Sequence, residues 1–143
     1  MKEPTQQPPL QLLTIGMLGA IAVAFGALGA HALKGQLQTG LITPDLLNGF
    51  DTGVKYHMYH TIAMLAVILL KTKYTHKFLS WAYHLFFWGI IFFSGSLYLL
   101  CTRHIFGAEW LSFLGPITPI GGLLFTAGWL LMAFSCFNKK SNS

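Results

Sequence analysis

Three histidines are the side chains most able to bind a metal ion. His31 lies near the end of the first apolar stretch, and His57 and His60 lie three residues apart near the start of the second. Residues three apart share a face of a helix, so this pair and a third imidazole could bind Zn²⁺ or Cu²⁺. No cysteine or carboxylate is placed to complete a closed site. The sequence therefore leaves a metal open and predicts no cofactor.

A wider set of polar residues accompanies these histidines. Each member falls near the same end of an apolar stretch, and part of the set shares one face of the second stretch. Polar side chains at membrane depth are costly and usually face the protein interior, so we expect one shared pocket. Its predicted residues are His31, Tyr56, His57, His60, Ser94, Tyr98 and Thr118. The alternative is structural, with these groups at the interface or hydrogen-bonded within and between helices.

Other chemistries lack the residues that they require. Haem would need two facing histidines, but His60 and His84 lie at opposite depths. A proton-coupled exporter normally has an acid within a span, and none of the four acidic residues lies in one. A disulfide between Cys101 and Cys136 would have to cross the membrane. No nucleophile, acid pair or phosphate-binding loop is recognisable, so the sequence favours a non-enzymatic protein.

Four long apolar stretches would position these residues. They cover residues 12–33, 54–70, 79–100 and 117–137. A helix rises 1.5 Å per residue, so about 20 apolar residues cross the hydrocarbon core. The chain is 54% hydrophobic and 9% charged, whereas a soluble domain has about 25% charged residues. The sequence therefore predicts an all-α membrane protein, a four-transmembrane-helix bundle.

The predicted bundle takes up nearly the whole chain. Residues 1–11 form a flexible lead, 12–137 a single transmembrane domain and 138–143 a basic tail. Residues 30–32, Ala-His-Ala, resemble a signal-peptide cleavage site. The apolar region before them exceeds the usual length of about 7 to 15 residues, so we expect the first span to be retained.

Basic residues between the apolar stretches predict the orientation. They form no stripe interleaved with exposed aromatics, so the net charge of +5 does not indicate a nucleic-acid partner. Lysines instead gather before the first stretch, between the second and third, and after the fourth: Lys2, Lys71, Lys73, Lys77, Lys139 and Lys140. The positive-inside rule then places both termini in the cytoplasm, or on the equivalent matrix side.

Small residues mark the expected helix contacts. In lipid they allow helix backbones to approach closely. The first span carries small residues on two faces, so we expect it to be the central helix. The predicted packing positions are Gly19, Gly26, Gly29, Gly89, Ser96, Gly121 and Gly122.

Thr43, Pro44 and Asp45 have the pattern of an N-cap, a first-turn proline and an acid that matches the helix dipole. This pattern predicts a helix that begins near Pro44. The helix either continues into the second span or lies at the interface and ends at Gly53.

Motifs in all four spans match one known pattern. They are residues 25–31 (FGALGAH), Tyr56 with His60, residues 93–98 (FSGSLY), and residues 117–122 (ITPIGG) with Gly128 and Trp129. Together they resemble the YgdD-type bacterial inner-membrane proteins, a family with mitochondrial relatives. The resemblance implies a four-helix fold in the bacterial inner (plasma) membrane, and it brings no established activity, substrate or cofactor. Glutamine is common in the family at the position of His57, so a metal triad that includes His57 would not be a family property.

These features predict an accessory or scaffold subunit of a membrane assembly, with another membrane protein or a second copy as its partner. The alternative is a membrane enzyme or ligand-binding protein. It would use the outer histidine and tyrosine pocket for a lipid, a quinone or a metal.

The orientation can be tested with reporter fusions. Fusions after Lys73 and Lys140 should report the cytoplasm, and fusions after Gln38 and Gly107 the outside, because the lysines lie on the cytoplasmic side. The reverse pattern at all four positions would contradict this topology.

Overall fold

The computed structural model describes residues 10–74 and 77–135 of the 143 residues. The tail predicted at 138–143, nearly all of the lead and Cys136 lie outside the described residues. Within the described part, four helical rods are long and apolar enough to cross a membrane. They are Leu10–Gln36, Pro44–Lys71, Lys77–Thr102 and Glu109–Phe134. The four-span fold predicted from the sequence is confirmed.

The first two rods differ in regularity. The first consists of α1 (Leu10–Leu28), a π-helical segment η1 (Gly29–Leu33) and the short α2 (Lys34–Gln36). The second is the single helix α3 (Pro44–Lys71). The π-helical segment holds more residues per turn than an α-helix, so it shifts which side chains face a neighbour.

The third rod is also interrupted. It comprises α4 (Lys77–Gly89), the π-helical η2 (Ile90–Gly95) and α5 (Ser96–Thr102). The fourth rod joins the 3-10 helix η3 (Glu109–Leu114) to α6 (Ile117–Phe134). Each of the two π-helical segments overlaps a stretch that carries the family resemblance.

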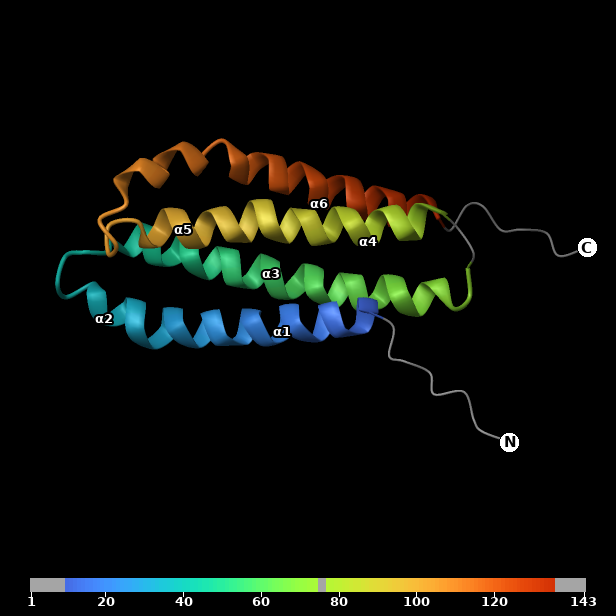
Figure 1. Ribbon diagram of the computed structural model, residues 1–143, viewed down its shortest axis with the longest axis horizontal. Helices are drawn as coiled ribbons and strands as arrows, with labels where there is room; N and C mark the ends of the chain where they lie inside the picture. The colour runs from blue at the N-terminus through green and yellow to red at the C-terminus, as the bar shows by residue number, and fades with distance from the viewer. Residues whose placement is uncertain (1–9, 75–76, 136–143) are drawn as a thin grey trace, which may run out of the picture.

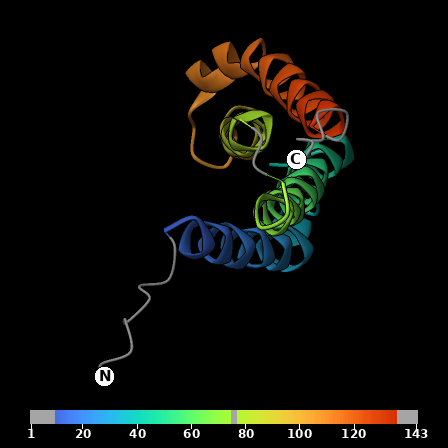
Figure 2. The same cartoon turned by 90° about the vertical axis from the view of Figure 1, so that its right-hand side faces the viewer.

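The rods run antiparallel in chain order (Figure 1). The start of α1, the end of α3, the start of α4 and the end of α6 share one end of the bundle. The end-on view shows α3 between α1 and the third rod, with α6 beyond (Figure 2). The middle of the bundle is therefore formed by α3 and the third rod.

The prediction that the first span is central is wrong. The α1 helix packs mainly on α3, and Ile15, Leu18 and Ala22 are its buried residues. The opposite small-residue face stays exposed, including Ala20 and Ala24. Small residues on two faces allow two close contacts, but the fold uses one of them.

The helix start predicted at Pro44 is confirmed. Thr43 has an extended backbone, and its hydroxyl accepts a hydrogen bond from the Leu46 amide at 3.3 Å. The helix then continues without a break to Lys71, so the alternative of an end at Gly53 is wrong. A Cβ built on Gly53 would lie 3.1 Å from the Tyr98 ring. Glycine at this position lets α5 approach α3 closely.

Aromatic rings fill glycine notches between the third rod and α6. A Cβ built on Gly89 would lie 2.6 Å from Cε1 of Phe125, and one on Gly128 would lie 2.6 Å from Cε1 of Phe86. Two reciprocal contacts thus join α4 and α6, each with a phenylalanine from one helix and a glycine from the other. At Gly121, an added Cβ would collide with the backbone of Phe93 itself.

The predicted packing positions divide between the two sides of the bundle. Gly26 and Gly29 lie against Val54 and Phe50 of α3, at 3.4 and 3.1 Å from an added Cβ, whereas Gly19 has more room. Gly89 and Gly121 lie in the contact between the third rod and α6. Gly122 lies at its margin, and Ser96 is hydrogen-bonded across it.

We expect Gly121→Ala to destabilise the bundle. Its methyl group would meet backbone atoms that cannot rotate away, and overpacking of this kind costs about 1–3 kcal/mol. The melting temperature of the purified full chain in detergent should therefore fall by several degrees. Gly95→Ala is the matched control, because an added Cβ there has open space within 4 Å. Equal melting temperatures for the two variants would contradict this packing.

Candidate functional site

The structure separates the predicted pocket residues into distinct places. His57 and Tyr98 meet beside α1, whereas Tyr56 and His60 face α6. Thr118 is bonded to the third rod, and His31 is exposed on η1. The prediction of one shared pocket is therefore wrong.

The first place is a buried histidine–tyrosine pair. Nδ1 of His57 lies 3.1 Å from the hydroxyl of Tyr98, and His57 is only 3% exposed. The Tyr98 ring lies among Phe25 of α1 and Phe50 of α3, with centroid distances of 4.5 and 5.0 Å. The pair joins α3 to α5 where α1 covers both.

This pair leaves one ring nitrogen without a partner. Nε2 of His57 and Oγ of Ser94 are the buried side-chain polar atoms that lack a hydrogen bond within residues 10–74 and 77–135. An unpaired buried polar group costs about 1–3 kcal/mol. Polar pairing is therefore incomplete at one residue of α3 and one residue of η2.

The second place centres on His60, whose two ring nitrogens are both hydrogen-bonded. The indole N–H of Trp129 donates to Nε2 at 3.2 Å, so Nε2 must carry a lone pair. The proton then lies on Nδ1, which donates to the carbonyl oxygen of Tyr56 at 2.7 Å. His60 is thus a neutral imidazole of defined tautomer that links α3 to α6.

The face of the same imidazole ring is packed against an aromatic ring of α6. The His60 ring lies parallel to Phe125, with centroids 3.4 Å apart and planes at 8°. Tyr56, one helical turn away on α3, stacks on Phe93 of η2 at 4.7 Å. The α3–α6 contact is therefore held by one stacked pair of rings as well as by one hydrogen bond, and the second stacked pair joins α3 to η2.

Trp129 is the functional partner that the site prediction missed. In the sequence it stands out only as part of the family motif, because a tryptophan in a span is usually a belt or packing residue. In the structure it is about half exposed. Its indole N–H was the available signal, since such a donor at membrane depth needs an acceptor.

A third polar contact joins the third rod to the start of α6. The Ser96 hydroxyl donates to the carbonyl oxygen of Phe93 at 2.9 Å and lies 2.6 Å from the Thr118 hydroxyl. Since the proton of Ser96 is used, Thr118 donates to Ser96. Both are oriented as links between helices.

The histidines do not converge on a metal. His31 projects away from α3, because its neighbours Gly29 and Leu33 are the buried residues of η1. His57 and His60 face different neighbours, and both nitrogens of His60 are occupied. No group of three histidine, cysteine or acidic residues in the described part of the chain could hold a metal ion.

A groove of about 690 Å³ lies beside His60 between α3 and α6. Its walls are mostly aromatic and aliphatic, with Tyr56, Tyr59 and Trp129 about half exposed. Such a groove has the volume of a small-molecule site. Of the predicted pocket residues, Tyr56 and His60 line it.

Four apolar rods with polar groups paired between them define an integral membrane protein with four spans. The sequence comparisons agree with this class. The family model described as "Protein of unknown function (DUF423)" matches residues 25–122. The chain therefore belongs to the DUF423 family, which confirms the resemblance seen in the sequence motifs.

Relatives share most of their length with this chain. It is 39% identical over 125 residues to the UPF0382 membrane protein SH2409 of Staphylococcus haemolyticus, covering 85% of this chain and 93% of the relative. It is 39% identical to the UPF0382 membrane protein YwdK of Bacillus subtilis, over 84% and 90% of the two chains. With the UPF0382 inner membrane protein YgdD of Escherichia coli it shares 33% identity over 90% of each chain. No solved structure matches the chain.

The link between α3 and α6 can be tested by Trp129→Phe. This change keeps an aromatic ring but leaves Nε2 of His60 without its donor, so stability should fall by about 1 kcal/mol. The measurement is thermal unfolding of the full chain in detergent. Trp88→Phe is the control, because Trp88 on α4 is exposed to a similar extent and its indole N–H forms no hydrogen bond within the described part of the chain. An unchanged melting temperature for Trp129→Phe would contradict the claim that the hydrogen bond to His60 stabilises the contact between α3 and α6.

Proposed function

We propose that this protein is a non-enzymatic accessory or scaffold subunit of a membrane assembly in the bacterial inner membrane. The supporting observation is how the polar side chains of the spans are used. His57, His60 and Ser96 bond to other helices, and no nucleophile with an adjacent base stands among them. The chemistry of these groups serves to hold one helix arrangement.

The inner-membrane location is part of the same proposal. It is supported by the lysine distribution of the sequence and by the name of the Escherichia coli relative, which is labelled an inner membrane protein.

The exposed face of α1 is the surface proposed for assembly. In the most apolar part of the first rod, as in that of the fourth, only 17% of the residues are buried. What distinguishes the first rod is its outward side, which has Gly16, Ala20 and Ala24 at intervals of four residues, all exposed. Such a row allows another helix to approach its backbone. The proposed occupant is a transmembrane helix of a different membrane protein.

Site-specific photo-crosslinking in intact membranes tests this assignment. A photoreactive residue at Ala24 should give one defined adduct with another membrane protein, whereas the same probe at the exposed Leu123 of α6 should give none. Ala20→Leu should abolish the adduct, because a bulky side chain separates the helices.

The matched control is Ala133→Leu, which makes the same change at an exposed position of α6 and should leave the adduct intact. Lipid adducts alone at Ala24 would contradict the accessory role. An adduct of two copies of this chain would contradict the choice of a different protein as partner.

A second candidate function is ligand binding in the groove between α3 and α6. Its aromatic lining favours a membrane-soluble molecule such as a lipid or a quinone, held by ring contacts because the nitrogens of His60 are occupied. A stoichiometric small molecule in mild-detergent preparations that is lost in Thr126→Phe would support this function. Retention by that variant would contradict it.

A further inference from the structure

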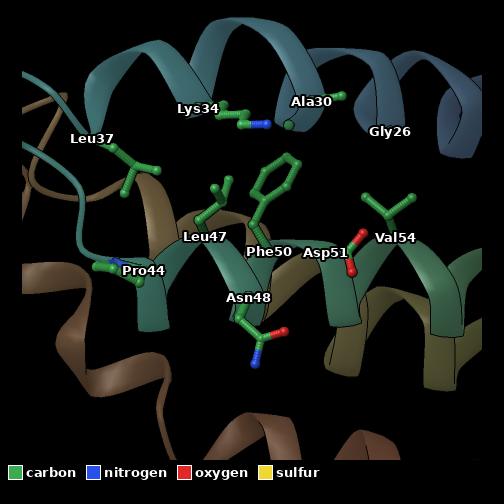
Figure 3. A pocket seen from close by; sticks show the side chains of 11 residues that line it. Gly26, Ala30, Lys34, Leu37, Pro44, Leu47, Asn48, Phe50, Asp51 and Val54 are labelled. Atoms are coloured by element: carbon green, nitrogen blue, oxygen red, sulfur yellow. The ribbon is translucent and has the colours of Figure 1, made fainter.

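A separate groove of about 390 Å³ lies between the first rod and the first half of α3. Figure 3 shows its two walls, with Gly26, Ala30 and Lys34 on one side and Phe50 and Val54 on the other. The two rods approach closely along it, because Gly29 leaves room for the Phe50 ring. The groove contains none of the residues predicted from the sequence as a pocket.

The groove is mostly apolar and has two charged residues, Lys34 on the first rod and Asp51 on α3. Leu47 and Phe50 point across it towards the first rod, and Asp51 lies between Phe50 and Val54 (Figure 3). The Lys34 side chain extends along the opposite wall. Eight residues separate Gly26 from Lys34, so the groove extends over about two helical turns. An elongated, mostly apolar groove with a lysine on its wall suits a lipid better than a soluble ion.

The end of the groove that carries Lys34 lies at the expected depth of lipid headgroups. Lys34 is two residues from the end of the first membrane-spanning rod. Exposed aromatic residues of the kind that settle at a membrane surface stand at the same end of the bundle, namely Phe106, Trp110 and Phe113. A ligand phosphate beside Lys34 would be at the level of the phosphates of the surrounding bilayer.

The charges along the groove favour an anion. Asp51 also lines the groove, but its carboxylate forms an ion pair with Lys55 at 2.6 Å. Lys34 is exposed, and no acid lies within ion-pair distance of it in the described part of the chain. The three charges sum to one positive charge, and it lies on the lysine that faces the groove.

We infer that this groove binds an anionic phospholipid of the phosphatidylglycerol type. Its phosphate pairs with Lys34, and one acyl chain runs past the exposed Ala30 towards Val54. The rest of the lipid remains in the bilayer, which the groove adjoins along its length. This site is independent of the proposed assembly role and of the groove beside His60.

The test uses the full chain in detergent with defined lipids, followed by native mass spectrometry. The added lipids are phosphatidylglycerol and phosphatidylcholine with identical chains, and inorganic phosphate serves as the headgroup alone. Phosphatidylglycerol should be retained in preference to phosphatidylcholine, and phosphate should not displace it. Equal retention of the two lipids, or displacement by phosphate, would overturn the assignment.

Two variants assign the binding to this groove. Lys34→Gln should lower phosphatidylglycerol binding about fivefold, since one lysine near lipid headgroups contributes roughly 1 kcal/mol. Lys73→Gln removes the same charge at the opposite end of the bundle and should have little effect. Ala30→Phe should block the acyl-chain path at an exposed position without disturbing the fold.

Each result bears on the assignment separately. Equal losses for Lys34→Gln and Lys73→Gln would show general electrostatic attraction and overturn it. Unchanged binding by Ala30→Phe, with its melting temperature in lipid-free detergent also unchanged, would likewise overturn it.

Discussion

The hydrocarbon core of a membrane offers no hydrogen bonds and no hydrophobic force between helices, and this constraint governs the whole bundle. Helices in lipid must be held by close packing and by polar groups that satisfy one another. Both devices meet between the third rod and α6. There Gly89 and Gly128 receive phenylalanine rings, and Ser96 bonds to Thr118. The α3 helix joins the same contact through His60 and Trp129.

This constraint changes the meaning of the polar residues in the spans. A cluster of histidine, tyrosine and serine near one membrane face can be a binding pocket or a set of helix links. In this protein His60 has both nitrogens occupied, and His57 lies against Tyr98 on the other side of α3. Two histidines three residues apart on α3 thus bond to two different helices, His57 to α5 and His60 to α6. The accessory role proposed for the protein rests on this use of its polar groups.

The number of spans and the start of α3 were predictable from the sequence because they depend on local properties. Length and apolar composition determine the four rods, and the Thr43 cap with Pro44 determines where α3 begins. The central position expected for the first span was wrong, because small residues permit close packing without specifying which face is used. The surface that α1 leaves exposed is visible only once its neighbours are placed.

The grouping of the site residues could not be derived from a regular helical repeat. The η1 and η2 segments are π-helical, so positions before and after them do not keep the spacing of 3.6 residues per turn. His31 therefore points away from the histidines of α3. The role of Trp129 could not be predicted from the residue pattern of a single span either, since its hydrogen bond to His60 joins residues 69 positions apart.

In this structure His60 links α3 to α6 as a fixed neutral imidazole. Nitrogen NMR of selectively labelled histidine in detergent-solubilised protein tests this role directly, with a His60→Phe spectrum to assign the signal. At neutral pH we expect the proton on Nδ1 and an unprotonated Nε2, and we expect both nitrogen signals to stay unchanged when Zn²⁺ is added. A doubly protonated ring, a proton on Nε2 or a shift of the signal on metal addition would contradict it.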